Sequence, residues 1–290
     1  MHTTKFSLII IALVLASLAC SLNINLPITT DVKTGASRTD EINIPPLDSI
    51  GEVAQLTLGF GAGEMNLSPG SADSLLVGET TYNVDDLKPK IYINGESIKV
   101  ETGNLNIDGI PNFHERVKNV WDLYLGTDPI DLTIKAGAYV GDFELGGLSL
   151  TDLHISDGAA DVSVNFGQPN LAEMETLRYE TGASNIKLSN LLNANFDTMI
   201  FQSGAGNYEL DFSGVAQRDA AVFIETGLSS LTIFVPETTN ARLTVEGGLA
   251  SITSRGSWTQ SGSEYRMNGE GPILTITAEM NAGNLILDTP

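Results

Sequence analysis

Apolar and polar residues alternate along this chain in a short pattern that recurs around glycine. In residues 177–188, apolar residues stand five and three positions before Gly182 and four positions after it. The same frame fits around these positions: Gly61, Gly103, Gly137, Gly158, Gly182, Gly204, Gly227, Gly248 and Asn281. The Gly137 copy departs from it, because its following apolar pair is delayed to Phe143 and Leu145. From Gly137 to Gly248 the spacings are 21, 24, 22, 23 and 21 residues, and such a period is typical of stacked repeats.

One repeat can be understood from strand geometry. Alternation with period two places every second side chain on one face, so the apolar positions of a copy share a buried side. Glycine reaches positive φ without a clash, and Asn is the next most tolerant residue. We therefore expect the glycines of the frame, and Asn281 in the last copy, to be structural corners between two strands.

The pattern predicts an all-β fold whose larger part is a β-solenoid of about 21–24-residue, glycine-cornered repeats. One such repeat cannot close a core, whereas stacked repeats bury a continuous one. A plain antiparallel meander or sandwich also uses glycine-rich turns and remains the alternative. The regular spacing favours the solenoid.

Two folded parts are expected. Residues 47–127 contain the strand-like runs 53–58, 98–103 and 119–125 and read as a small N-terminal β domain. Residues 128–290 hold the regular repeats, and Asp128-Pro129 marks the boundary.

One insertion interrupts the repeats. Gly248 and Asn281 are 33 residues apart, and residues 255–271 between them carry Trp258 and Tyr265 among Gly, Ser and Glu. We expect residues 284–287 to be the open end of the stack, because the chain stops soon after them. The insertion is then expected to fold over that end, since exposed apolar strand edges invite association.

The N-terminus carries export signals. Residues 1–19 have Lys5, an apolar stretch and small residues before a cleavage point, which is typical of a signal peptide. Cys20 follows, and residues 15–20 resemble a bacterial lipobox, so Cys20 is expected to be the lipidated first residue. Ordinary secretion with the same cleavage site is the alternative. Residues 20–46 are polar and end in Pro45-Pro46, which predicts a lipid-anchored linker.

Charge excludes some partners. The chain has 15 Lys+Arg against 36 Asp+Glu, a formal net charge of −21. Binding to nucleic acid or to anionic lipid headgroups relies on cationic side chains, so neither is expected. The chain has 1 cysteine, so no intrachain disulfide can form.

We predict neither a metal, a cofactor nor a catalytic residue. His114 and His154 are isolated, and zinc sites need three or four ligands. His154 is two residues from Asp152 without a nucleophile beside it, which favours an exposed surface pair. Residues 59–63 are glycine-rich but lack the lysine of a phosphate loop. The repeats also lack the Gly-Gly-x-Gly-x-Asp motif of calcium-binding solenoids.

Residues 76–83, 87–89 and 119–131 resemble the toast-rack proteins of bacterial envelopes. The resemblance covers residues 50–290. It implies an N-terminal toast-rack domain followed by a β-solenoid related to the C-terminal domain of LiaF-type cell-wall-stress regulators and to adhesins. The family supplies no established catalytic residues.

Together these features predict a non-enzyme. We expect an exported lipoprotein, anchored at the outer face of the cytoplasmic membrane or in the cell envelope, that acts as a surface interaction module of adhesin type. Its partner would be an envelope or surface protein, or a polysaccharide. One alternative is a regulatory partner in envelope stress sensing, although such regulators usually carry transmembrane helices and none is expected after residue 20. The other is a polysaccharide-active enzyme, which would need two carboxylates at one groove.

Overall fold

The computed structural model describes residues 29–31, 33–48, 51–71, 73–103, 110–112 and 116–289. Nearly all elements there are strands, and the helical ones are two short 3₁₀ turns, η1 (Asp85–Leu87) and η2 (Leu191–Ala194). The chain divides into two units, residues 1–33 with 106–115 and residues 34–105 with 116–290. In the first, β1 (Thr29–Asp31) pairs in parallel with β7 (Ile110–Asn112). The second unit is described below.

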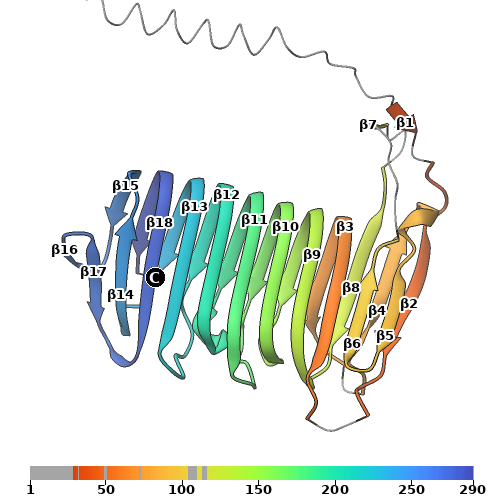
Figure 1. The fold of residues 1–290 in the computed structure, drawn as a ribbon, viewed down its shortest axis with the longest axis horizontal. Coiled ribbons are helices and arrows are strands. Elements are labelled where there is room, and N and C mark those ends of the chain that lie inside the picture. The colour runs from red at the N-terminus through yellow and green to blue at the C-terminus, as the bar shows by residue number, and fades with distance from the viewer. Residues whose placement is uncertain are drawn as a thin grey trace, which may run out of the picture. The chain divides into compact units, whose positions relative to one another are not determined.

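Long parallel strands, each hydrogen-bonded to the next, form the body of the second unit (Figure 1). Their order in the sheet is β3 (Ala54–Pro69), β9 (Pro129–Glu144), β10 (Ser149–Asn165), β11 (Met174–Ser189), β12 (Phe196–Asp211), β13 (Ala220–Phe234) and β18 (Glu270–Asp288). From β9 to β13, the segment after each strand returns to the start of the next and buries an apolar side chain such as Phe166, Phe212 or Val235. Each strand and its return therefore make one coil, and the predicted all-β, solenoid-like fold class is confirmed.

Equivalent repeat positions lie side by side in the sheet. Leu177 pairs with Met199, which pairs with Val222, which pairs with Ile276. The apolar positions five and three residues before each frame glycine, and four residues after it, are buried wherever their side chains are described, except at Val245 and Ile252. The alternation read from the sequence therefore describes the core correctly.

Six of the frame glycines, together with Asn281, lie within strands and not between them: Gly61, Gly137, Gly158, Gly182, Gly204 and Gly227. Gly103 and Gly248 lie outside the strands. In β11 the buried residues are Tyr179 and Thr181 before the glycine and Ser184 after it, whereas Gly182 and Ala183 are exposed. The inward alternation thus shifts by one residue where the strand bends. The expected positive φ is wrong, because none of the frame glycines, nor Asn281, is among the described residues that have one.

Close packing of backbones explains glycine at the bend instead. A Cβ on Gly204 would lie 2.6 Å from the carbonyl oxygen of Gly182. A Cβ on Gly182 would overlap the carbonyl oxygen of Gly158, and one on Gly227 would overlap that of Gly204. The glycines therefore form a column in which each coil lies against the backbone of the one before it. Gly248 has no atom within 4 Å of its Cβ position.

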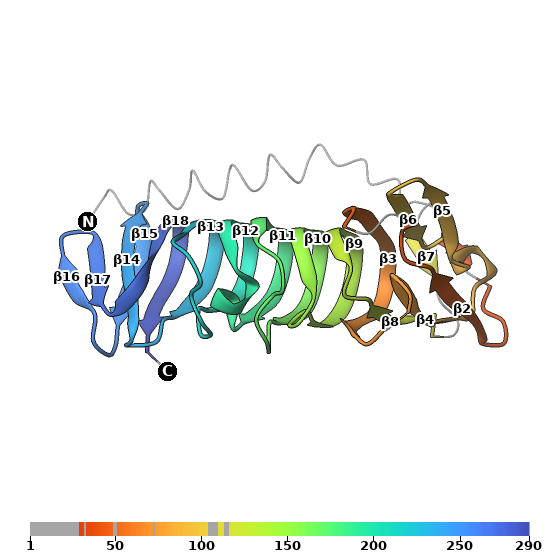
Figure 2. The same cartoon turned by 90° about the horizontal axis from the view of Figure 1, so that it is seen from below.

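The order of the last coils differs from the order in the sequence (Figure 2). The C-terminal strand β18 lies between β13 on one side and β14 (Thr239–Glu246) with β15 (Leu249–Ser254) on the other. The expectation that residues 284–287 form the open end of the stack is therefore wrong. The coil of Gly248 is the outer one.

The insertion covers part of that outer coil. It contains β16 (Thr259–Ser261) and β17 (Glu264–Asn268), and β17 pairs antiparallel with β14. Tyr265 and Met267 are buried, and Trp258 packs against the core. The insertion is thus a cover, as expected, but it covers β14 and not the final strand of the chain.

At the other end, the two halves of β3 have different partners. β6 (Ser97–Glu101) pairs with its first half and carries β5 (Lys90–Asn94). β8 (Asn119–Leu125) pairs with its second half, followed by β4 (Leu76–Tyr82) and β2 (Arg38–Ile44). The strand β2 comes from the segment expected to be a linker. The pairing of β3 with β9 carries the sheet across the expected boundary at residues 127 and 128.

Candidate functional site

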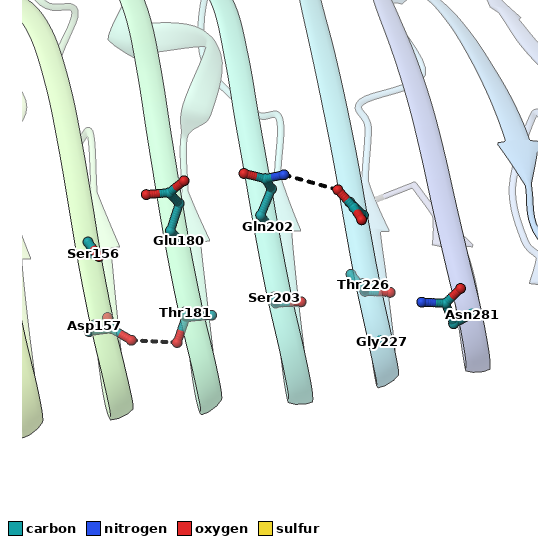
Figure 3. A pocket seen from close by; sticks show the side chains of 10 residues that line it. Ser156, Asp157, Glu180, Thr181, Gln202, Ser203, Thr226, Gly227 and Asn281 are labelled. Atoms are coloured by element: carbon teal, nitrogen blue, oxygen red, sulfur yellow. Dashed lines mark hydrogen bonds between the residues drawn. The ribbon is translucent and has the colours of Figure 1, made fainter.

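A groove of about 370 Å³ runs across several coils beside the column of glycines (Figure 3). Strands β10, β11, β12 and β13 each contribute the two residues before their glycine. The lining residues are Ser156, Asp157, Glu180, Thr181, Gln202, Ser203, Glu225, Thr226, Gly227 and Asn281. Because the coils are in register, these residues form an outer and an inner row.

The outer row carries charge. The amide of Gln202 donates a hydrogen bond of 3.0 Å to the carboxylate of Glu225. Glu180 lies 2.9 Å from Nε2 of His154 and 3.3 Å from Nη1 of Arg178. The hydrogen bond from His154, with further help from Arg178, holds the pKa of Glu180 below its usual value. Glu180 therefore stays ionised on the groove wall.

The inner row is built around Asp157. Its side chain is buried and accepts a 2.8 Å hydrogen bond from the Tyr179 hydroxyl and another from the Thr181 hydroxyl. Tyr139 and Ser184 add longer hydrogen bonds of 3.5 Å. Burial raises the pKa of Asp157, and these hydroxyl donors oppose that rise. The cluster holds a mostly buried carboxyl group inside the bend, at the wall of the groove.

Hydroxyl groups continue the inner row along the stack. Ser229 donates to Thr226 over 2.9 Å. The hydroxyls of Ser203 and Tyr208 are buried and make no hydrogen bond of good geometry within the described part of the chain. Burial raises the pKa of Tyr208, and the neighbouring Ser203 hydroxyl opposes that rise. The Ser203 hydroxyl is thus buried beside Tyr208, although other atoms of Ser203 line the groove.

The residues singled out from the sequence lie in different places. Gly227 and Asn281 line the groove, and the side chain of Asn281 projects at one end of it (Figure 3). Gly227 is also the last glycine of the column along the bend. The other members of this column are Gly61, Gly137, Gly158, Gly182 and Gly204. Gly103 approaches the backbone of Asp86 beside β6. Gly248 belongs to the outer coil, between β14 and β15. Cys20 and His114 lie outside the described residues.

The sequence predicts that His154 pairs with Asp152, but the structure shows a different contact. His154 reaches Glu180 on the next strand. Asp152 is instead paired in register with Asp131. Burial raises the pKa of both carboxyl groups, and the charge of Asp131 raises the pKa of Asp152 further. No group of three side chains that could hold a metal ion occurs among the residues with described positions.

Apart from Gly227 and Asn281, the sequence analysis did not identify the residues that line the groove. A signal for them existed. The position directly before the glycine is inward by alternation, yet it is polar in Asp157, Thr181, Ser203 and Thr226. Polar residues at a predicted core position in successive repeats indicate a buried polar cluster or a binding surface.

Comparison with known proteins defines the family. Residues 33–176 match the family model described as the N-terminal domain of toast_rack, DUF2154. The chain therefore belongs to the toast-rack family, as the resemblance read from the sequence implied. No curated protein matches the chain.

A solved structure has a similar fold. A protein of Clostridium sporogenes, named a "putative cell adhesion protein", aligns with 88% of this chain and 100% of its own length, at 14% identity and a TM-score of 0.51. A "putative adhesin" from Parabacteroides distasonis covers 89% of this chain and 100% of its own, with 12% identity and a TM-score of 0.36. At these identities the likeness concerns the fold alone. The described part of the chain contains no helix with the length and apolar character of a membrane span.

Proposed function

We propose that this protein is an exported, lipid-anchored envelope protein whose stacked coils act as a non-catalytic interaction module of adhesin type, and that the groove binds an extended polysaccharide. The observation that carries this proposal is the repetition of equivalent polar groups from coil to coil along one groove. Neighbouring strands are about 4.8 Å apart, so the donors and acceptors recur at a short, regular interval. A chain molecule with repeating hydroxyl groups matches such a row.

The charges of the groove restrict the ligand. The carboxylates of Glu180 and Glu225 repel phosphate-containing or acidic polymers, as does the net charge of −21. A neutral sugar chain meets no such repulsion and can donate hydroxyl protons to these carboxylates, a strong class of hydrogen bond. The cell-adhesion name of the Clostridium sporogenes protein supports the proposal only at the level of the class.

Binding can be tested with neutral polysaccharides by affinity electrophoresis of the full chain. The double variant Gln202→Ala, Glu225→Ala removes two neighbouring groups of the outer row. Two hydrogen bonds worth about 1 kcal/mol each predict a loss of affinity on the order of tenfold or more. The control is Asn207→Ala, because Asn207 lies on the same strand after the bend, is exposed and also makes one side-chain hydrogen bond.

The proposal requires the control to migrate like the unchanged protein and the double variant to lose its retardation. Equal retardation of both variants would show that the groove is not the polysaccharide site. Absence of retardation by any neutral polysaccharide, with binding of an acidic or cationic one, would overturn the assignment of the ligand.

A further inference from the structure

One strand at the outer end of the stack has an unpaired edge. β15 is hydrogen-bonded to β18 on one side, and no strand of the described residues pairs with its other side. The other half of the same coil, β14, is covered by β17. Figure 1 shows β15 beside β18, with β16 and β17 next to β14. The cover over the end of the stack is therefore incomplete.

The side chains of β15 are exposed where a further strand would cover them. Ile252 stands four positions after Gly248, where the other coils place the buried residues Ile186, Tyr208 and Leu231. Ile252 is 39% exposed, and Ser251, Thr253 and Ser254 are exposed as well. A side chain that belongs to the core by its position is thus open to solvent for lack of one more strand.

The charge pattern indicates what that strand is. Natural edge strands are usually protected by charged residues or proline. The edge strand β2 carries Arg38, Asp40 and Glu41, but β15 has the neutral sequence Leu-Ala-Ser-Ile-Thr-Ser. In a chain with a net charge of −21, a neutral strand is a place where a second copy can approach with little repulsion.

Charges beyond the two ends of β15 set the direction of pairing. The exposed residue Glu246 precedes the strand. Arg255 directly follows it, is exposed, and has one guanidinium nitrogen 3.4 Å from Asp288 of the same chain. Antiparallel pairing of two copies brings Arg255 of each copy toward the Glu246 end of the other, whereas parallel pairing in register brings like charges together. We propose that β15 is a self-association edge, through which two copies join antiparallel about a two-fold axis into one continuous sheet.

The test measures the mass of the full chain in detergent by sedimentation velocity over a range of concentrations. The unchanged protein is expected to form a dimer. The variant Ile252→Lys adds a charge to the edge and should weaken dimerisation by tenfold or more. The control Phe223→Lys changes a side chain that is 50% exposed on β13, inside the stack, and should leave the dimer intact.

A charge exchange separates self-pairing from other arrangements. Arg255→Glu alone should weaken the dimer, and Glu246→Arg combined with Arg255→Glu should restore it, because the opposite charges then meet again across the two-fold axis. Thermal unfolding of each variant shows whether its fold is intact. An unchanged protein that stays monomeric at all concentrations overturns the proposal, as does a dimer that persists in both Ile252→Lys and Arg255→Glu. A monomer that captures a different protein through β15 also contradicts self-association.

Discussion

At the scale of single residues, Asp157 shows how the stack holds a carboxyl group inside its bend. Only 9% of its surface is exposed, and the hydroxyls of Tyr179 and Thr181 donate to it. Burial disfavours the charged form and raises the pKa, while hydroxyl donors favour the charged form and limit that rise. The balance leaves the pKa of the folded state above its ordinary value of 3.8.

This raised pKa predicts the pH dependence of stability. The folded state holds the proton of Asp157 more tightly than the unfolded state, so its contribution is most favourable at low pH. That contribution is lost as pH rises from about 3.8 through the pKa of the folded state. The variant Asp157→Asn keeps an acceptor for the hydroxyls but cannot ionise, so its stability should depend less on pH than that of the unchanged protein.

The measurement is urea unfolding of both proteins at several pH values in this window. Asp131 and Asp152 also have raised pKa values, but they remain in both proteins, so the difference between the two curves isolates Asp157. Parallel curves would contradict the assigned pKa shift. This holds equally for a variant that is less stable by the same amount at every pH.

At the scale of the strand, the bend depends on backbone proximity. The sequence suggested positive φ because glycine is the usual residue for a left-handed turn. From Gly137 to Gly227, the structure instead places each glycine of the column against the carbonyl group of the preceding coil, so what matters there is the absence of a Cβ atom.

The chain itself offers a matched pair of glycines that tests this explanation. Gly204→Ala places a Cβ 2.6 Å from the carbonyl oxygen of Gly182, whereas Gly248→Ala meets nothing within 4 Å. Neither glycine has positive φ. We expect Gly204→Ala to lower the free energy of unfolding by about 1–3 kcal/mol and Gly248→Ala to change it by about 0.5 kcal/mol or less. Denaturant unfolding measures both, and equal losses would contradict the packing argument.

Much of the element structure could be read from the sequence, because burial follows alternation. The positions of Leu177, Tyr179 and Ile186 relative to Gly182 were enough to place them in the core. The order of the coils could not be read in this way. A repeat pattern shows that β14, β15 and β18 belong to coils, but it does not show which coil lies next to which. Here the hairpin of β16 and β17 lets the chain pass the outer coil and return inside it.

The groove was hidden from sequence reading for a related reason. Its outer row contains Ser156, Glu180, Gln202 and Glu225, which share a register but no single side-chain type. Their common property is position, two residues before the bend. These residues form one continuous surface only when the coils are aligned in space.

At the scale of the whole molecule, stacking gives each chain one continuous groove, and pairing through β15 would give each assembly two. Two linked sites can hold a long polymer more firmly than either alone, provided that the polymer spans both. For an adhesin of the envelope this arrangement would favour long surface polysaccharides over short sugars. Its effect also depends on how the protein is held at the cell surface.

We predict that the protein is held at the membrane by a lipid on Cys20. Cys20 is the single cysteine of the chain and directly follows the expected signal peptide. We expect mass spectrometry of native protein to find a mature N-terminal peptide that begins with a lipid-modified Cys20. The variant Cys20→Ser should move the protein from the membrane fraction to the soluble fraction, because it removes the thiol that carries the lipid. As a control, Gln202→Ala should remain with the membrane, since the groove has no part in anchoring. A Cys20→Ser variant that stays in the membrane fraction, or a native N-terminus that starts elsewhere without lipid, would show that the protein is held by other means or is simply secreted.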